Sequence, residues 1–336
     1  MRWEKIHRQL KCLFEKFDAE RRCRINIFNL RLIRINAARK NILSLQTENS
    51  PFNLDNDKAY QAWRARKLEN YPSDLLALVV EVNDPRRLTR AEHEAILTRC
   101  QLANMAIYAS PLKNEDKAIP RELGKQFNLT QLDSNMCADE DAITSLTVAS
   151  GGTRQTYIPY TNRPIHWHTD GYYNALNKQI YGMLLHCVRS AEKGGENALL
   201  DHEIAYILLR DENPDYIYAL MQPEVMCIPP NVTNGEEIRP TRCGPVFSLA
   251  PGGNLHMRYT KRKRSITWQS DKLTQAAVQF LEKMLDSDSA YIFRATLQAG
   301  QGLISNNVLH DRSGFTETKQ QRLLYRARYY QRIANT

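Results

Sequence analysis

Residues 163–174 read RPIHWHTDGYYN, and a distant second stretch, residues 305–315, reads SNNVLHDRSGF. In the first stretch, His168 and Asp170 stand two positions apart, so on an extended chain both side chains leave the same face. Together with His310 they can supply two imidazoles and one carboxylate, the set that holds a non-heme Fe(II) and leaves the opposite coordination positions open. An H-x-D pair alone is a weak signal, and a histidine-rich strand end is its plain alternative.

A basic strand after His310 strengthens the metal interpretation. His310 follows the apolar strand GLIS, and the alternation of residues 322–330 puts Arg322, Arg326 and Arg328 on one side of a strand. An unpaired buried guanidinium is costly, so several inward-facing arginines require an anionic partner. The sequence therefore predicts an anion beside the metal.

The turn at residues 194–197, GGEN, is a third feature of the same kind. Two consecutive glycines allow a tight turn in which the backbone approaches a ligand, and Asn197 can donate a hydrogen bond to that ligand. The alternative is an ordinary hairpin turn.

These motifs together resemble the taurine dioxygenase/TfdA-like Fe(II)- and 2-oxoglutarate-dependent oxygenases. The family pattern W-H-T-D is present at residues 167–170, its G-G-x-T turn corresponds to GGEN, and its distal histidine followed by R-x-x-x-R corresponds to His310, Arg322 and Arg326. Order and spacing agree over residues 60–332. The resemblance implies a mainly β (α+β) fold with a double-stranded β-helix, or jelly roll, surrounded by helices.

The resemblance also implies an oxidoreductase in which His168, Asp170 and His310 hold Fe(II). Three protein ligands leave three positions on an octahedral iron, two for 2-oxoglutarate and one for O2. The implied reaction releases succinate and CO2 and hydroxylates a C–H bond of a small molecule.

Three further residues are implied contacts of the cosubstrate. Arg322 would bind the distal carboxylate of 2-oxoglutarate through a bidentate guanidinium contact. Asn197 stands where the family usually has Thr. Arg326 would hold either the cosubstrate or an anionic group of the substrate, and the sequence leaves this choice open.

Four residues of the first stretch are candidate substrate contacts. His166 is predicted to donate a hydrogen bond to a metal ligand, or to contact the substrate, without binding the metal itself, since the family match falls on His168. Tyr172, Tyr173 and Asn174 follow the metal motif on an expected active-site loop and would line the substrate pocket. Packing against the sheet is the alternative for these three.

The order of expected elements favours strands decorated by helices. No G-x-G-x-x-G follows an early strand, which disfavours a dinucleotide-binding fold. Residues 222–245, rich in proline, are expected to be an irregular insertion in a single domain covering 51–336. Helices are predicted at 60–68, 89–104, 116–128, 202–210, 214–221 and 271–285. Thr89, followed three residues later by Glu92, forms a capping box ahead of the second of these helices. Strands are predicted at 75–82, 105–109, 143–149, 180–188, 197–200, 246–249, 255–259, 291–297, 302–305 and 322–330. The strands at 246–249 and 255–259 are expected to form a hairpin across PGGN.

The positive charge is concentrated at the N-terminus. The chain carries a net charge of +9; residues 1–50 hold 12 Lys/Arg and 5 Asp/Glu, or +7, and the remaining residues contribute +2. We therefore expect a basic N-terminal extension over residues 1–50 and a nearly neutral body, which disfavours a nucleic-acid groove in the body. Contact of the extension with nucleic acid stays an open alternative.

The seven cysteines never form a C-x-x-C pair, and they are predicted to be reduced thiols of a cytoplasmic protein. We expect no membrane span, because no apolar run approaches the ~20 residues that one requires. Formation of a homo-oligomer is left open. Two other functions remain alternatives: an oxygenase acting on a macromolecular or carrier-bound substrate, and a non-catalytic metal-binding jelly-roll protein.

Overall fold

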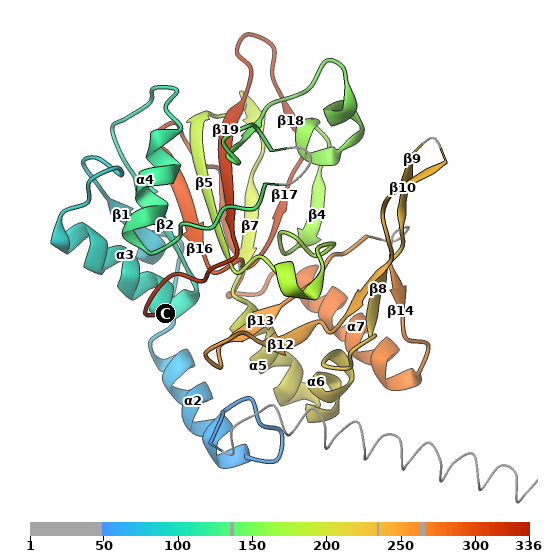
Figure 1. The fold of residues 1–336 in the computed structure, drawn as a ribbon. Coiled ribbons are helices and arrows are strands. Elements are labelled where there is room, and N and C mark those ends of the chain that lie inside the picture. The colour runs from blue at the N-terminus through green and yellow to red at the C-terminus, as the bar shows by residue number, and fades with distance from the viewer. Residues whose placement is uncertain (1–48, 135–137, 234, 263–265) are drawn as a thin grey trace, which may run out of the picture.

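A computed structural model describes residues 49–134, 138–233, 235–262 and 266–336 (Figure 1). The expected N-terminal extension lies outside these residues except for its last two positions. Within the described chain, six α-helices surround several β-sheets. None of these helices is both long and apolar enough to cross a membrane.

The largest sheet has six strands in the order β1-β2-β16-β5-β19-β3. β1 pairs with β2 in parallel, and the other neighbours are antiparallel. The strands are β1 (Val79–Glu81), β2 (Met105–Ala109), β3 (Thr144–Leu146), β5 (Gly182–Arg189), β16 (Gln301–Ser305) and β19 (Leu323–Tyr329).

A second sheet of four antiparallel strands carries the two metal-motif stretches. Its order is β15-β7-β17-β4, so β17, from the end of the chain, pairs directly with β4. The strands are β4 (Ile165–His168), β7 (Asn197–Leu200), β15 (Phe293–Ala295) and β17 (Leu309–Arg312).

One apolar cluster joins the two sheets. It contains Leu185 and Leu303 from the six-stranded sheet and Leu199 and Phe293 from the four-stranded sheet. Alternation explains this arrangement, because every second side chain of a strand points to the same face. Burial of these side chains at about 25 cal/mol per Å² provides the main force that holds the sheets together.

The opposite face of the six-stranded sheet is covered by two helices, α3 (Arg90–Ala103) and α4 (Ala118–Gln126) (Figure 1). The predicted capping box at the start of α3 is confirmed: the side chain of Thr89 accepts from the backbone N–H of Glu92, and the Glu92 carboxylate accepts from that of Thr89. Two reciprocal hydrogen bonds of this kind satisfy helix N–H groups that lack an intrahelical partner.

The remaining helices form a layer beyond the four-stranded sheet, below it in Figure 1. They pack there with the hairpin of β12 (Phe247–Leu249) and β13 (Leu255–Met257), which confirms the hairpin predicted across PGGN. These helices are α2 (Asp57–Glu69), α5 (His202–Glu212), α6 (Pro214–Leu220) and α7 (Lys272–Leu285).

The prediction of one strand over residues 75–82 is only partly right. Leu76–Leu78 form a 3₁₀ turn, and β1 begins at Val79. The carboxylate of Asp74 accepts a hydrogen bond from the backbone N–H of Ala77 at 3.0 Å, which favours a turn over an extended chain at this point.

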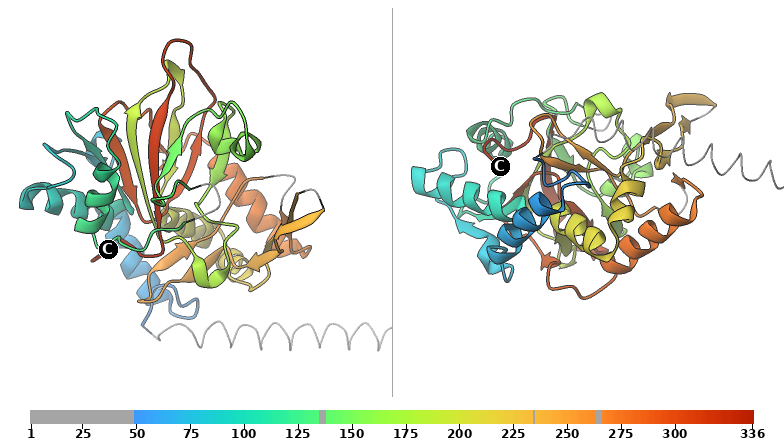
Figure 2. Two further views of the ribbon diagram at one scale, coloured as in Figure 1. Left: turned by 45° about the horizontal axis from the view of Figure 1, so that its top comes forward. Right: turned by 90° about the horizontal axis from the view of Figure 1, so that it is seen from below.

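Residues 222–245, expected to be irregular, contain four short strands. β8 is flanked by β11 and β14 in a three-stranded sheet, and β9 and β10 form a hairpin that projects from the body (Figure 2). Strands of three or four residues separated by prolines contain too few residues for an alternation of apolar and polar side chains to be recognised in the sequence. The four strands are β8 (Met226–Ile228), β9 (Asn231–Thr233), β10 (Glu236–Arg239) and β11 (Arg242–Gly244), and β14 (Thr267–Trp268) joins β8 from outside this segment.

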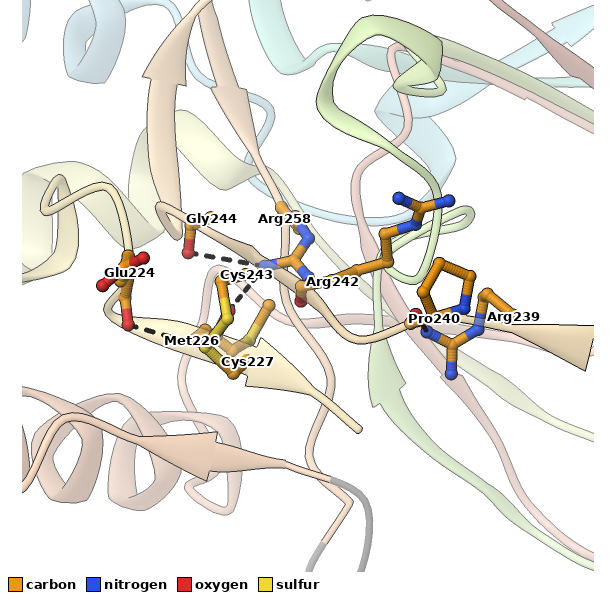
Figure 3. Close-up of a disulfide and its surroundings, with 9 residues drawn as sticks. All are labelled: Glu224, Met226, Cys227, Arg239, Pro240, Arg242, Cys243, Gly244 and Arg258. Atoms are coloured by element: carbon orange, nitrogen blue, oxygen red, sulfur yellow. Dashed lines mark hydrogen bonds between the residues drawn. A yellow bond between two sulfur atoms is a disulfide. The ribbon is translucent and has the colours of Figure 1, made fainter. Parts of the chain in front are cut away.

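The prediction that the cysteines are reduced is wrong for Cys227 and Cys243, which form a disulfide (Figure 3). They lie directly opposite each other on β8 and β11, with Cα atoms 4.0 Å apart. A separation of 16 residues is not a motif spacing, so only knowledge of the hairpin register identifies the pair. Cys100 and Cys187 are buried free thiols, and the other three cysteines lie outside the described residues.

Candidate metal centre

His168, Asp170 and His310 come together at the junction of β4 and β17. His168 ends β4 and is the register partner of His310, and Asp170 follows two residues later. The two imidazole rings are 4.2 Å apart between centroids, and one ligand atom from each of the three side chains lies within 4.8 Å of the others. The predicted convergence of residues far apart in sequence is therefore present.

Both histidines present the same ring nitrogen to this space. The Nδ1 atom of His168 lies 2.9 Å from the carbonyl oxygen of His166, and that of His310 lies 2.9 Å from the carbonyl oxygen of Val308. A carbonyl can only accept, so each Nδ1 carries the proton and each Nε2 keeps a free lone pair. This is the tautomer in which a histidine binds a metal through Nε2.

Charge states at the centre suit a cation. Burial, together with the nearby His310, lowers the pKa of His168 to about 3, so its imidazole is neutral at pH 7. Burial raises the pKa of Asp170, but the positive charges of Arg326 and Arg328 outweigh this effect and hold the pKa well below its usual range. Asp170 is thus ionised, and its buried Oδ2 atom has no hydrogen-bond partner among the described residues.

Asn307 fixes the backbone at Asp170. Its Oδ1 accepts from the Asp170 N–H at 2.8 Å, while its Nδ2 donates to the carbonyl oxygens of Asp170 at 2.9 Å and Ile180 at 2.7 Å. Its φ of 52° lies in the left-handed region, which asparagine tolerates better than most residues. This role was not predicted from the sequence, although an asparagine three residues before the distal histidine was an available signal.

A segment after β13 holds β4 from its other side. The backbone N–H of Thr169 donates to the carbonyl of Tyr259 at 3.0 Å, and that of Lys261 donates to the carbonyl of Trp167 at 2.8 Å. His168 therefore lies between two paired chains, β17 on one side and residues 259–261 on the other.

Arg322 lies buried just before β19, next to the GGEN turn. Its guanidinium stacks over the ring of Phe315 at 4.9 Å, and Phe315 pairs with Gly194 between β18 (Phe315–Thr316) and β6 (Lys193–Gly194). A Cβ on Gly195 would lie 3.7 Å from Arg322 Nε. Within the described chain, the guanidinium has no hydrogen bond and no ion pair; the Glu317 carboxylate accepts instead from the backbone N–H of Arg322, at 2.8 Å.

The two arginines of β19 itself have protein partners. Arg326 donates to Asp170 Oδ1 at 3.2 Å, and Arg328 donates to the hydroxyl of Tyr173 at 2.8 Å and pairs with Asp133. The predicted alternation is confirmed, because Leu324 joins the core between the sheets while Leu323, Tyr325 and Ala327 join the core under α3 and α4.

The remaining candidates differ in their surroundings. The amide nitrogen of Asn197 donates to the carbonyl of Asp311 at 2.8 Å across the sheet. His166 is exposed on β4, where its carbonyl orients the His168 ring. Asn174 donates to the carbonyl of Lys178 at 2.9 Å, so its side chain closes a turn.

Tyr172 lies beside a metal ligand, and Tyr173 packs against Tyr172. The ring of Tyr172 is buried edge-on to the ring of His168, with centroids 6.4 Å apart, and contacts the ring of Tyr173 at 5.2 Å. Arg258 anchors this loop by donating to the carbonyl of Tyr172 at 2.7 Å.

The family model described as "Taurine catabolism dioxygenase TauD, TfdA family" matches residues 121–328. A uridine-5'-phosphate dioxygenase from Amycolatopsis sp is 31% identical over 170 residues, which cover 48% of this chain and 60% of that protein. A uridine-5'-phosphate dioxygenase from Streptomyces sp is 28% identical over 196 residues, covering 56% of this chain and 69% of that protein.

The fold is shared with a solved enzyme. The crystal structure of the non-heme iron oxygenase OrfP in complex with Fe, succinate and (3R,4R)-dihydroxy-L-Arg has a TM-score of 0.54 and 13% sequence identity. The similarity covers 73% of this chain and 82% of that chain.

Proposed function

This chain belongs to the TauD, TfdA family of dioxygenases, and we propose that it is an Fe(II)- and 2-oxoglutarate-dependent dioxygenase that oxidises a C–H bond of a small molecule. The observation that carries the proposal is the convergence of His168, Asp170 and His310 with both histidine Nδ1 atoms already occupied by carbonyl groups. We interpret the two sheets joined by one core as the double-stranded β-helix of that family.

The donor set fits iron. Two neutral imidazoles and one ionised carboxylate form a facial triad that suits non-heme Fe(II). Bound Fe(II) would supply O2 activation coupled to the conversion of 2-oxoglutarate to succinate and CO2. The chain's own residues prepare the site: the carbonyls of His166 and Val308 hold the rings, and Asn307 holds the backbone of Asp170.

Arg322 suits the distal carboxylate of 2-oxoglutarate better than Arg326 does. Arg322 is buried without an anionic partner, whereas Arg326 already pairs with Asp170. A guanidinium without a counter-ion in a buried position can bind a carboxylate bidentately at little cost, since the protein has already removed it from water. In this arrangement Arg326 keeps Asp170 ionised. Asn197 would act through Asp311 rather than by touching the cosubstrate.

The substrate class follows from the relatives. Both curated relatives are uridine-5'-phosphate dioxygenases by name, and they match the chain over about half of its length. We therefore propose a phosphorylated small molecule, with a nucleoside 5'-phosphate as the leading candidate. Tyr172 and Tyr173 would line its pocket, because they extend from the loop that directly follows Asp170.

The decisive test is anaerobic. Fe(II) and 2-oxoglutarate are added to metal-free protein, and the visible charge-transfer band of the chelated complex is measured. We expect a band that disappears in His168→Ala and weakens strongly in Arg322→Ala. Arg90→Ala is the matched control, because Arg90 is an exposed α3 arginine that pairs with Glu94. A folded wild-type protein that binds iron without producing the band would refute the proposal.

A further inference from the structure

We propose that Arg239, Arg242 and Arg262 form a binding site for the phosphate group of the substrate. This site is called the arginine cluster below. The inference rests on the proposed dioxygenase function, because it assigns the substrate's anionic group to a specific part of the same site. None of these residues belongs to the motif through which the family was recognised.

The three arginines come from two segments that meet beside the metal centre. Arg239 ends β10 and Arg242 begins β11, so they flank one turn of the disulfide-bonded region (Figure 3). Arg262 follows the segment 259–261, whose backbone pairs with β4 on both sides of His168. The side chain of Arg242 extends away from the disulfide (Figure 3).

Tyr172 connects the arginine cluster to the metal ligands. The guanidinium of Arg258 donates both to the carbonyl of Tyr172 at 2.7 Å and to the carbonyl of Arg242 at 2.8 Å, so the backbone of Tyr172 lies close to that of Arg242. The ring of Tyr172 is in turn 6.4 Å from the ring of His168 between centroids. A phosphate held by the arginine cluster would therefore leave the rest of a small substrate close to the metal.

The arginine cluster lacks compensating negative charge. Lys261 pairs with Asp286, but none of the three arginines has a carboxylate partner among the described residues. Arg239 donates only to the neutral carbonyls of Pro229 and Pro240, at 2.8 and 3.0 Å. The Nε atom of Arg242 is buried without any hydrogen-bond partner in the described chain. Such positive charge brought together without an anion is costly unless a ligand supplies the anion.

A fourth arginine makes this region rigid. The buried guanidinium of Arg258 donates to the carbonyls of Tyr172 and Met226 at 2.7 and 3.0 Å, and to those of Arg242 and Gly244 at 2.8 and 3.4 Å. It thereby ties the loop after Asp170 to both disulfide-bonded strands. These four carbonyl partners are neutral, so Arg258 adds a further positive charge to the region. Burial and the nearby positive charge of Arg239 lower the pKa of Arg258 to about 10.

Close packing keeps the arginine cluster in place. A Cβ on Gly244 would lie 2.7 Å from the Leu176 side chain, so the loop after Asp170 lies directly against β11. A binding site whose positive groups are already held in position loses little entropy when the ligand binds.

The test compares ligands that differ only in the phosphate. Binding of uridine 5'-phosphate, uridine, ribose 5-phosphate and inorganic phosphate is measured by calorimetry on full-length protein carrying Fe(II) and 2-oxoglutarate under anaerobic conditions. At least one organic phosphate should bind tenfold or more tightly than its dephosphorylated form. Arg239→Gln and Arg242→Gln should each lower that affinity by about tenfold to hundredfold, the usual effect of removing a charge-assisted hydrogen bond.

Controls separate this inference from the proposed function. Arg90→Gln should bind the phosphates as the wild type does, and Arg242→Lys should restore part of the lost affinity because it restores the charge. The charge-transfer band tests the iron site independently, and phosphate binding can also be measured on metal-free protein. The inference is overturned if no phosphate compound binds, if dephosphorylated forms bind equally well, or if both glutamine variants bind like the wild type.

Discussion

Replacement of Asn307 should damage the fold and the metal centre together. The side chain is 1% exposed and makes three hydrogen bonds, two to Asp170 and one to Ile180. A net contribution of about 1 kcal/mol for each bond predicts a loss of about 3 kcal/mol in the free energy of unfolding for Asn307→Gly. Asn307→Ala should lose about 1 kcal/mol more, because alanine at a φ of 52° is strained.

Urea unfolding of metal-free protein measures these losses. Asn128 provides the matched control, because it is exposed and has a similar φ of 59°. In Asn128→Ala the free energy of unfolding should therefore fall only by the strain of alanine at a positive φ, about 1 kcal/mol. Metal affinity of the Asn307 variants should fall by about tenfold to hundredfold, the usual effect of removing a group that orients a ligand. If Asn307→Ala and Asn128→Ala were equally stable relative to wild type, the hydrogen bonds of Asn307 would contribute nothing and the reasoning would fail.

Three further predictions concern ligands, the disulfide and acid. Fe(II) with 2-oxoglutarate at about 100 times its dissociation constant should stabilise the protein by about 2.7 kcal/mol, and a chelator should reverse this in a thermal-shift assay. Replacing Cys227 and Cys243 together by serine should cost about 3 kcal/mol in urea unfolding, because the disulfide closes a loop of 16 residues, and a reductant should leave the variant unaffected. Burial raises the pKa of Asp139, but hydrogen bonds from Lys117, Ser145 and Arg154 outweigh it and lower the pKa to about 2. The ionised Asp139 contributes about 1–2 kcal/mol to the free energy of unfolding after solvent screening, and this contribution is present above pH 4 and lost as the pH falls toward 2. In Asp139→Asn the free energy of unfolding should therefore depend less on pH between 4 and 2.

The elements that were predicted well have strong local signals. The box of Thr89 and Glu92 located the start of α3, and the five residues Met105–Ala109 were identified as a strand with the observed bounds. The hairpin across PGGN was recognised because glycine and asparagine favour its turn. In each case the information lies within a few neighbouring residues.

The parts that could not be predicted depend on contacts between distant segments. The Cys227–Cys243 disulfide requires the register of two three-residue strands, and the hydrogen bonds of Arg258 go to backbone carbonyls, which leave no trace in side-chain patterns. The His168–Asp170–His310 grouping was accessible because its residue types are chemically restricted. The choice between Arg322 and Arg326 was not, since the alternation expected from the sequence places both on one face and only their neighbours in the structure distinguish them.

The pairing of His168 with His310 also has a consequence for how the chain folds. The local part of the site, His168 and Asp170, can form as soon as β4 is extended, whereas His310 arrives only when β17 has docked beside it. Bringing together segments so distant in sequence carries a loop-closure cost and is slow compared with the formation of local structure. Tight metal binding should then coincide with one of the last steps of folding. The rate of metal binding during refolding, measured by stopped flow, should therefore equal the rate at which the four-stranded sheet is completed.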